Sequence, residues 1–308
     1  MTNTTQPLCK FTTNYVFIFA YSLVFLISLV LNCITMRVYF CTNLRAQSSI
    51  TVYMKNLAVA DFFICLGLLL RIVSSANNSD IMFKIYCSFT GATLYSSILF
   101  MDAIAVNRYL KIVQPLESTG LQTVCIARHI SAAIWLFMLA LSSIYLILIP
   151  QNSWGLDQKL DELSCGSQHS LKLSLANKII RCVCFLIFIF VLVSLIPLYW
   201  KILQKLRQVQ LSTQTTFNSQ TFRNSKRNML VLIVIFCVCF VPFHLVYLPA
   251  MFIQPLLHDC SALHVLHILK ELSTLFAGLN ASLDPLIYFL FSRAFRAHFN
   301  FTSCQDCP

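Results

Sequence analysis

The sequence predicts an all-α membrane protein, a bundle of seven helices that each cross a bilayer. Hydrophobic residues make up 58% of the chain and charged residues only 11%, well below the roughly 25% charged residues of a soluble domain. The apolar residues also gather into seven stretches, each as long as the roughly 20 residues that a spanning helix needs. Helices are expected because a backbone in lipid must satisfy its hydrogen bonds within its own segment.

The seven spans follow one another with short connections, so we expect residues 1–308 to form a single membrane domain. Strands of a membrane β-barrel would be about half as long and alternating, and no such segments occur. A short amphipathic helix is expected on the cytoplasmic side after the seventh span. The predicted spans are residues 14–40, 50–73, 84–113, 129–150, 175–203, 226–253 and 263–291.

Basic residues predict the orientation of the bundle. Most of the 22 Lys and Arg residues lie after the first, third, fifth and seventh spans, and basic loops stay in the cytoplasm. The N-terminus is therefore expected outside, where Asn3 begins an Asn-Thr-Thr glycosylation sequon. Because this topology explains the net charge of +11, we expect no nucleic-acid partner.

Four of the 14 cysteines fall in the oxidising space that this topology places outside: Cys9, Cys87, Cys165 and Cys260. Four cysteines allow three pairings. A bond between Cys87 and Cys165 would hold the longest outer loop over the mouth of the bundle, and Cys9 would then join Cys260. We expect this pairing, and the other two stay open.

Three spans carry a carboxylate near the middle of the membrane: Asp61, Asp102 and Asp284. A charge at that depth costs at least about 2.5 kcal/mol, so an intramembrane acid indicates a functional site. For Asp102 we favour a structural interpretation, in which a protonated acid is bonded to a neighbouring helix.

Short motifs occur in six of the seven spans. They are Asn32, the run from Asn56 to Asp61, Asn107-Arg108-Tyr109, Trp135, the run from Phe236 to Pro242, and Asp284-Pro285-Leu286-Ile287-Tyr288. In this order the motifs resemble those of the rhodopsin-like (class A) G-protein-coupled receptors along the whole chain. The resemblance implies a plasma-membrane receptor and not an enzyme. It also implies a heterotrimeric G protein, of the inhibitory class, as partner, with arrestin as a candidate second partner.

The resemblance also assigns roles in activation. Arg108 would contact the G protein, and Tyr288 and Tyr199 would restrain it in the active state. Proline removes a helix hydrogen bond, which predicts hinges in the sixth and seventh spans. The residues expected to carry coupling and activation are Asn107, Arg108, Tyr109, Tyr199, Phe240, Pro242, Pro285 and Tyr288.

Asn107 stands where most of the family has an aspartate, so Arg108 would lack its adjacent counter-ion. We expect a weaker inactive state and higher basal signalling from this difference. The alternatives are a decoy receptor that binds ligand without coupling, or a constitutively active orphan receptor.

Asp61, Ser97, Asn280 and Asp284 match the family's polar pocket, which commonly holds a sodium ion. Carboxylate, hydroxyl and amide oxygens are suitable ligands for a hard cation. The alternative is a hydrogen-bonded water network without an ion. No other cofactor is expected.

The last third of the chain resembles the purinergic ADP and UDP-glucose receptors and their orphan relatives. In those receptors, residues like His244 and Lys270 bind phosphorylated ligands, for which a cation is a suitable partner. Tyr247 replaces their arginine, which argues against ADP itself. The expected ligand is an extracellular anionic small molecule that is either nucleotide-like or lysophospholipid-like.

For a lysophospholipid, Lys270 with His244 or Arg71 would bind the head group. The candidate ligand-binding residues are therefore Arg71, Tyr95, His244, Tyr247 and Lys270. Lys172, Lys178 and Arg181, near the outer end of the fifth span, could contribute, or they could be interfacial residues whose charges reach the membrane surface.

Other classes of membrane protein lack their features in this sequence. A transporter would show internal repeats with broken helices, and a channel would show a polar filter segment. An enzyme would need a nucleophile beside a base.

Overall fold

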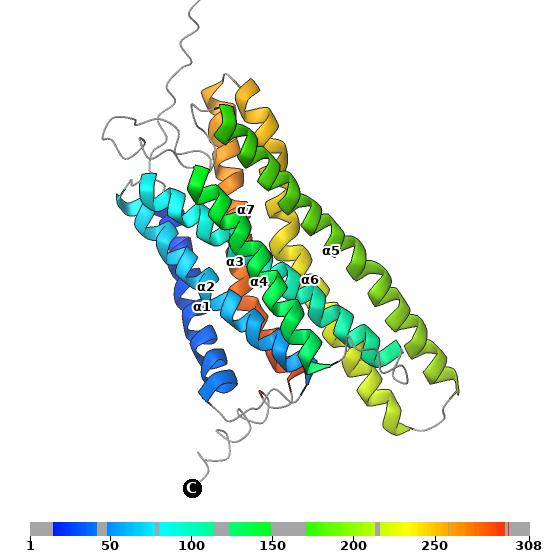
Figure 1. The fold of residues 1–308 in the computed structure, drawn as a ribbon. Coiled ribbons are helices and arrows are strands. Elements are labelled where there is room, and N and C mark those ends of the chain that lie inside the picture. The colour runs from blue at the N-terminus through cyan, green and yellow to red at the C-terminus, as the bar shows by residue number, and fades with distance from the viewer. Residues whose placement is uncertain are drawn as a thin grey trace, which may run out of the picture.

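A computed structural model describes residues 15–41, 48–77, 80–113, 123–148, 171–212, 216–257, 259–292 and 295. Seven long helices form a bundle (Figure 1). They are α1 (Tyr15–Met36), α2 (Ser49–Asn77), α3 (Asp80–Val113), α4 (Val124–Leu148), α5 (Leu171–Ser212), α6 (Thr216–Ile253) and α7 (Cys260–Phe291). A π-helical turn, η1 (Arg37–Cys41), continues α1, and a 3-10 turn, η4 (Gln254–Leu256), follows α6.

All seven helices are long and apolar enough to cross a membrane, and the described part of the chain contains no strand. The predicted seven-helix membrane fold is confirmed. Helices α5 and α6 extend beyond the predicted spans, to Ser212 and from Thr216. The amphipathic helix expected after the seventh span lies outside the described residues, apart from the buried Phe295.

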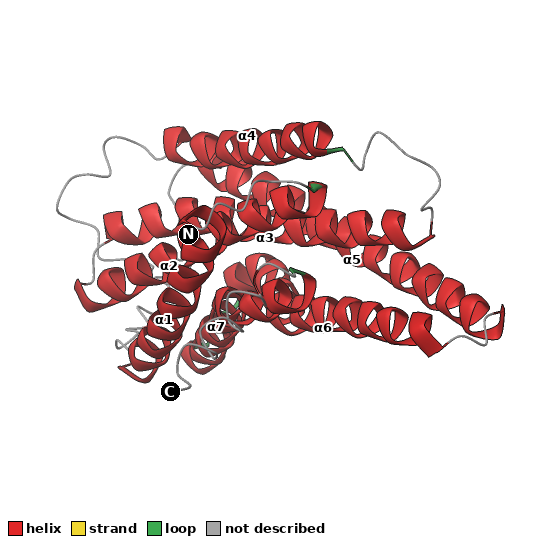
Figure 2. Ribbon diagram, turned by 90° about the horizontal axis from the view of Figure 1, so that it is seen from below, coloured by secondary structure: helices red, strands yellow, loops and turns green. Residues whose placement is uncertain are grey.

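Helix α3 lies at the centre of the bundle and contacts α2, α4, α5 and α6. Seen along the bundle, α4 lies on one side of α2 and α3, and α1, α7 and α6 lie on the other (Figure 2). Helices α1, α3, α5 and α7 begin at the end that is uppermost in Figure 1, which we call the upper end. Helix α7 ends at the opposite, lower end.

The bundle places polar side chains inside and apolar side chains on its surface. Asn32, Asp61, Asn280 and Asp284 are fully buried, whereas many large apolar side chains of α1, α4 and α5 face outward, such as Phe19, which is 72% exposed. This is the pattern of a protein whose solvent is lipid, because unsatisfied polar groups are costly in hydrocarbon. The polar residues of the interior are therefore the place to look for a functional site.

The predicted hinge prolines lie within helices that continue through them. Pro242 lies in α6 and Pro285 in α7, and α5 and α6 contain the further prolines Pro197 and Pro249. Movement at these points stays a prediction. Asp259 directly precedes α7, and its carboxylate accepts hydrogen bonds from the backbone N–H groups of Ser261 and Ala262 and so caps the helix.

Candidate functional site

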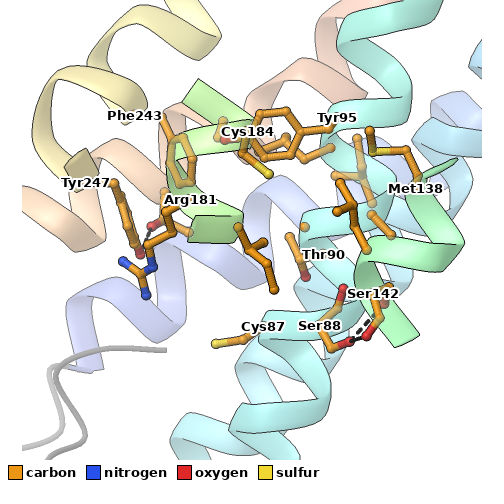
Figure 3. A pocket seen from close by; sticks show the side chains of 18 of the residues that line it. Cys87, Ser88, Thr90, Tyr95, Met138, Ser142, Arg181, Cys184, Phe243 and Tyr247 are labelled. Carbon is orange, nitrogen blue, oxygen red and sulfur yellow. Dashed lines mark hydrogen bonds between the residues drawn. The ribbon is translucent and has the colours of Figure 1, made fainter. Parts of the chain in front are cut away.

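A cavity of 180 Å³ lies in the upper half of the bundle. Figure 3 shows side chains that line it. Helices α2 to α7 all contribute to its wall. Most of the lining is apolar, including Leu68, Leu94, Met138 and Phe243. On one side Ser88 and Ser142 join α3 to α4 through a hydroxyl–hydroxyl hydrogen bond of 2.8 Å. A mostly apolar cavity with a few polar groups is the usual form of a small-molecule site.

Three of the five predicted ligand residues line this cavity: Tyr95, His244 and Tyr247. The Tyr95 hydroxyl lies 2.9 Å from His244 Nε2. His244 Nδ1 lies 2.8 Å from the carbonyl oxygen of Phe240, which can only accept, so Nδ1 donates. Nε2 of a neutral imidazole then accepts from Tyr95. The His244 ring also stacks on Phe188, with 3.9 Å between ring centroids, so three contacts fix the position of this histidine in the wall.

The other two predicted ligand residues, Arg71 and Lys270, lie outside the described lining of the cavity. Arg71 forms an ion pair with Glu271, and these two side chains are only 11% and 10% exposed. The Tyr21 hydroxyl donates to the same carboxylate over 2.9 Å. Lys270 is 3% exposed, and its Nζ donates to Oε1 of Gln254 over 2.6 Å. The expectation that Arg71 supplies a ligand charge is weakened, because Glu271 already neutralises it.

Arg181 on α5 lines the cavity. Its guanidinium lies 5.8 Å from the centre of the Tyr247 ring, and Figure 3 shows the two side chains next to each other. Among the described residues, no hydrogen bond or ion pair involves Arg181. The sequence left this residue open between a ligand role and an interfacial one, because its facing depends on how α5 is rotated against α6.

Other lining residues carried no signal in the sequence. Examples are Thr90, Cys184 and Thr274, small side chains that only the packing of the helices brings to the cavity. Thr274 contacts the predicted residue Tyr247 through a hydroxyl–hydroxyl hydrogen bond of 2.9 Å. This bond joins α6 to α7 at the wall of the cavity.

The four residues of the predicted sodium pocket meet in the middle of the bundle. Nδ2 of Asn280 lies 2.9 Å from both Ser97 Oγ and Asp284 Oδ2. Ser97 donates to Asp61 Oδ1 over a long 3.5 Å, and the Tyr288 hydroxyl donates to Asp61 Oδ2. Helices α2, α3 and α7 are therefore joined by one buried polar network.

This network contains acceptor oxygens with no hydrogen-bond partner among the described residues. They are Oδ1 of Asp284, Oδ1 of Asn280 and Oδ1 of Asn32, all buried. Asn32 reaches the network from α1, where its Nδ2 donates to the carbonyl of Ala281 over 2.7 Å. Buried acceptors without donors are costly, and a hard cation or ordered water would satisfy them. The donor set fits a sodium ion.

At the lower end, the Asn107-Arg108-Tyr109 motif makes contacts that its sequence did not predict. Asn107 Nδ2 donates to the Ser49 hydroxyl on α2 over 2.7 Å. Arg108 Nη2 donates to the carbonyl oxygen of Phe291 over 2.8 Å. For Tyr109, the contact is with Lys201, whose Nζ lies 5.8 Å from the ring centroid.

The remaining activation residues are buried or half-buried. Phe240 is fully buried beside Phe236, with 5.3 Å between ring centroids. The Tyr288 hydroxyl donates to Asp61 and Arg108 donates to the carbonyl of Phe291, so the expected restraint of Arg108 by Tyr288 in the active state stays a prediction. Tyr199 is half-buried against the core, and no described hydrogen bond joins it to Arg108.

Asp102 is bonded to a neighbouring helix, as expected. Ser194 Oγ on α5 lies 2.6 Å from Asp102 Oδ1 and 2.8 Å from the carbonyl oxygen of Val191. A hydroxyl has one proton. Ser194 can donate it to the carboxyl group of Asp102 or to the carbonyl of its own helix. The bond to α5 supports a structural role for Asp102, and its protonated state stays a prediction.

Two of the four predicted disulfide cysteines can be checked. Cys87 and Cys260 each take part in a disulfide bond, whereas the eight other described cysteines are free. Cys9 and Cys165, the other two cysteines of the pairing, lie outside the described residues, as does the sequon residue Asn3. The pairing and the glycosylation stay predictions.

The seven spanning helices, the cavity at one end and the arginine-bearing motif at the other define a multi-pass membrane receptor. Residues 32–288 match the model of the 7 transmembrane receptor (rhodopsin family). The chain therefore belongs to the rhodopsin family of G-protein-coupled receptors. Membership implies a plasma-membrane receptor that couples to a G protein and responds to small molecules, and not an enzyme.

Similar proteins show to which group of receptors within the rhodopsin family the chain is related. The chain is 31% identical to G-protein coupled receptor 87 of Mus musculus over 286 residues, which are 89% of this chain and 76% of the relative. It is 28% identical to purinoceptor 14 of Bos taurus, over 90% of this chain and 82% of the relative. Probable G-protein coupled receptor 34 of Pan troglodytes is 27% identical, over 95% and 77%. These similarities place the protein among the purinergic-like receptors.

Proposed function

We propose that this receptor binds an extracellular amphiphilic anion, with one phosphate or carboxylate on an apolar body, and then activates a heterotrimeric G protein. The ligand class is lysophospholipid-like rather than nucleotide-like. The observation that carries this choice is the composition of the cavity wall, which is mostly apolar and contains Arg181 as a lining cation. In this proposal the upper end, with the N-terminus, faces outside the cell.

A nucleotide fits this wall less well. A nucleoside diphosphate carries several negative charges and polar groups, which need more than one cation and many donors. Here Glu271 neutralises Arg71, Lys270 is bonded to Gln254, and His244 is bonded to Tyr95. An amphiphile needs one anion site and an apolar surface, and the cavity offers both.

Arg181→Ala tests the proposal in cells that express the receptor. We expect lysophospholipids to activate the wild type, and the variant to need about 10- to 100-fold more ligand, because a hydrogen bond to a charged group contributes about 1.5–3 kcal/mol. Lys178→Ala is the matched control, since Lys178 is exposed one turn earlier on the same helix.

The readout is nucleotide exchange in a panel of G proteins, beginning with the inhibitory class. Activation by nucleotides with full potency in Arg181→Ala would contradict the proposed ligand class. No exchange with any G protein, with or without ligand, would favour the decoy receptor that Asn107 suggests. High exchange without ligand would favour the constitutively active alternative.

We also propose that the buried network around Asp61 and Asp284 holds a sodium ion. The acceptor oxygens of Asn32, Asn280 and Asp284 that have no described donor support this assignment. A bound cation would neutralise part of the charge of the two carboxyl groups and would hold α1, α2, α3 and α7 in one arrangement.

A further inference from the structure

The last turn of α7 lies at the lower end, beside α3 and α6. The final carbonyl groups of a helix have no donor within the helix and carry the partial negative charge of the helix dipole. Helix α7 ends at Phe291, and the backbone N–H of Ser292 donates to the carbonyl of Tyr288 over 2.9 Å. The carbonyls of Leu290 and Phe291 come after this last capped position.

Side chains from two other helices donate to these two carbonyls. Asn228 on α6 donates through Nδ2 to the carbonyl of Leu290 over 3.0 Å. Arg108 on α3 donates through Nη2 to the carbonyl of Phe291 over 2.8 Å. The Arg108 guanidinium also lies 4.8 Å from the centre of the Phe291 ring, which is buried. Adjacent carbonyls of one helix thus accept from α3 and from α6.

We propose that these four residues form a clasp that holds the lower ends of α3, α6 and α7 together, and that the clasp must open before a G protein can bind. The clasp consists of Arg108, Asn228 and the carbonyls of Leu290 and Phe291. This inference rests on the proposed function, because it assumes that Arg108 contacts the G protein. It gives Asn228 a role as a positioning residue for α6.

The clasp gives Arg108 an acceptor that the residue before it, Asn107, does not provide. Asn107 offers no carboxylate to Arg108, and its amide donates to Ser49 on α2 instead. The C-terminal end of α7 supplies a partner for Arg108 through a backbone oxygen and the negative end of the helix dipole. Asn228 on α6 donates to the neighbouring carbonyl of the same helix end, so an outward movement of α6 would break the bond between Asn228 and Leu290.

Asn228→Leu tests the clasp, because it removes the donor at similar side-chain volume. In full-length receptor in nanodiscs, we expect about a two- to tenfold rise in ligand-free nucleotide exchange, the range for loss of one neutral hydrogen bond. Asn228→Gln keeps the amide and should restore part of the restraint. Arg227→Ala, at an exposed position on the same helix, should leave exchange unchanged.

A distance measurement separates the clasp from the proposed coupling. Spin labels on unnatural amino acids at Lys226 and Leu286, both exposed, avoid the native cysteines and report the separation of α6 from α7. Asn228→Leu should shift the distance distribution toward longer values without any G protein. An unchanged distribution in Asn228→Leu would overturn the clasp. A shift without exchange in any receptor variant would support the clasp and contradict the proposed coupling.

Discussion

At the scale of single residues, the polar network in the interior contains oxygen atoms that have no donor among the residues that the structure describes. Asp61 has two protein donors, Tyr288 and Ser97, whereas Asp284 accepts from Asn280 and its Oδ1 has no donor among the described residues. Two fully buried carboxyl groups in one network are unfavourable unless a proton or a cation compensates their charge. The choice between a sodium ion and water therefore depends on what compensates the charge of Asp284.

Sodium chloride should stabilise the purified receptor more than potassium chloride at equal ionic strength. A site filled at one to ten times its Kd adds about 0.4–1.4 kcal/mol to the free energy of unfolding. Asp284→Asn should abolish the difference between the two salts, because it removes a charged ligand. Thermal unfolding in nanodiscs measures the effect, and equal stabilisation by both salts in the wild type would support the water network.

At the scale of the helices, one buried ion pair joins α2 to α7. Arg71 and Glu271 are both nearly buried, and Arg71 also lies 5.5 Å from the centre of the Tyr86 ring on α3. The pair joins these two helices but is not part of the described lining of the cavity. Its contribution to stability depends on both partners, since either one alone would be an uncompensated charge.

Glu271→Gln should lower the free energy of unfolding by about 3–5 kcal/mol, because it leaves Arg71 charged and buried. The double variant Arg71→Gln with Glu271→Gln should recover much of this loss, since no charge is then left unpaired. Thermal unfolding of the single and double variants measures the coupling. A double variant less stable than Glu271→Gln would show that Arg71 stabilises the bundle by another contact.

Individual helices were easier to predict than the contacts between them. The seven spans are visible as apolar runs, because each helix satisfies its own backbone within one segment. The extensions of α5 to Ser212 and of α6 from Thr216 are not apolar runs. Outside the hydrocarbon a helix can consist of polar residues, so apolar runs do not predict where these two helices end or begin. Arg71 and Glu271 are 200 residues apart, and only the packing of α2 on α7 brings them together. The same packing places Arg71 in an ion pair outside the described lining of the cavity.

The residues of the polar network could be predicted because the resemblance to a family assigned them as a set. The partners of Arg108 could not, because a backbone carbonyl such as that of Phe291 leaves no trace in the residue types. Arg181 and Lys178 are both cations one turn apart, yet only Arg181 lines the cavity. Their difference depends on helix rotation, which the apolar surface of α5 leaves undetermined.

At the scale of the whole molecule, α7 takes part in every site described above. Thr274 and Gly278 line the cavity, Asn280 and Asp284 belong to the polar network, and the last turn supplies the carbonyls that accept from Arg108 and Asn228. Tyr288 connects the last two sites, since its hydroxyl binds Asp61 and it lies half a turn before Leu290. A ligand that changes the position of α7 therefore acts on all three sites at once.

Tyr288→Phe should weaken the coupling between the cavity and the lower end while keeping the aromatic ring. Binding free energies are reciprocal, so a G protein that stabilises the open clasp must also raise ligand affinity, typically by about 5- to 150-fold. We expect this ratio to fall toward one in Tyr288→Phe, because Asp61 then loses its link to the end of α7. Binding of a radiolabelled lysophospholipid with and without G protein in nanodiscs measures the ratio.

Tyr39→Phe is the matched control for this experiment. The Tyr39 ring packs edge-on against Tyr288, with 5.7 Å between centroids, and its hydroxyl donates to the sulfur of Met54 over 3.4 Å. The variant therefore loses a hydroxyl from the same aromatic cluster but leaves the bond to Asp61 intact, so the ratio should stay at the wild-type value. An equal fall in both variants would assign the coupling to the aromatic packing at the lower end. An unchanged ratio in Tyr288→Phe would mean that α6, through Tyr247 and Asn228, connects the two ends instead of α7.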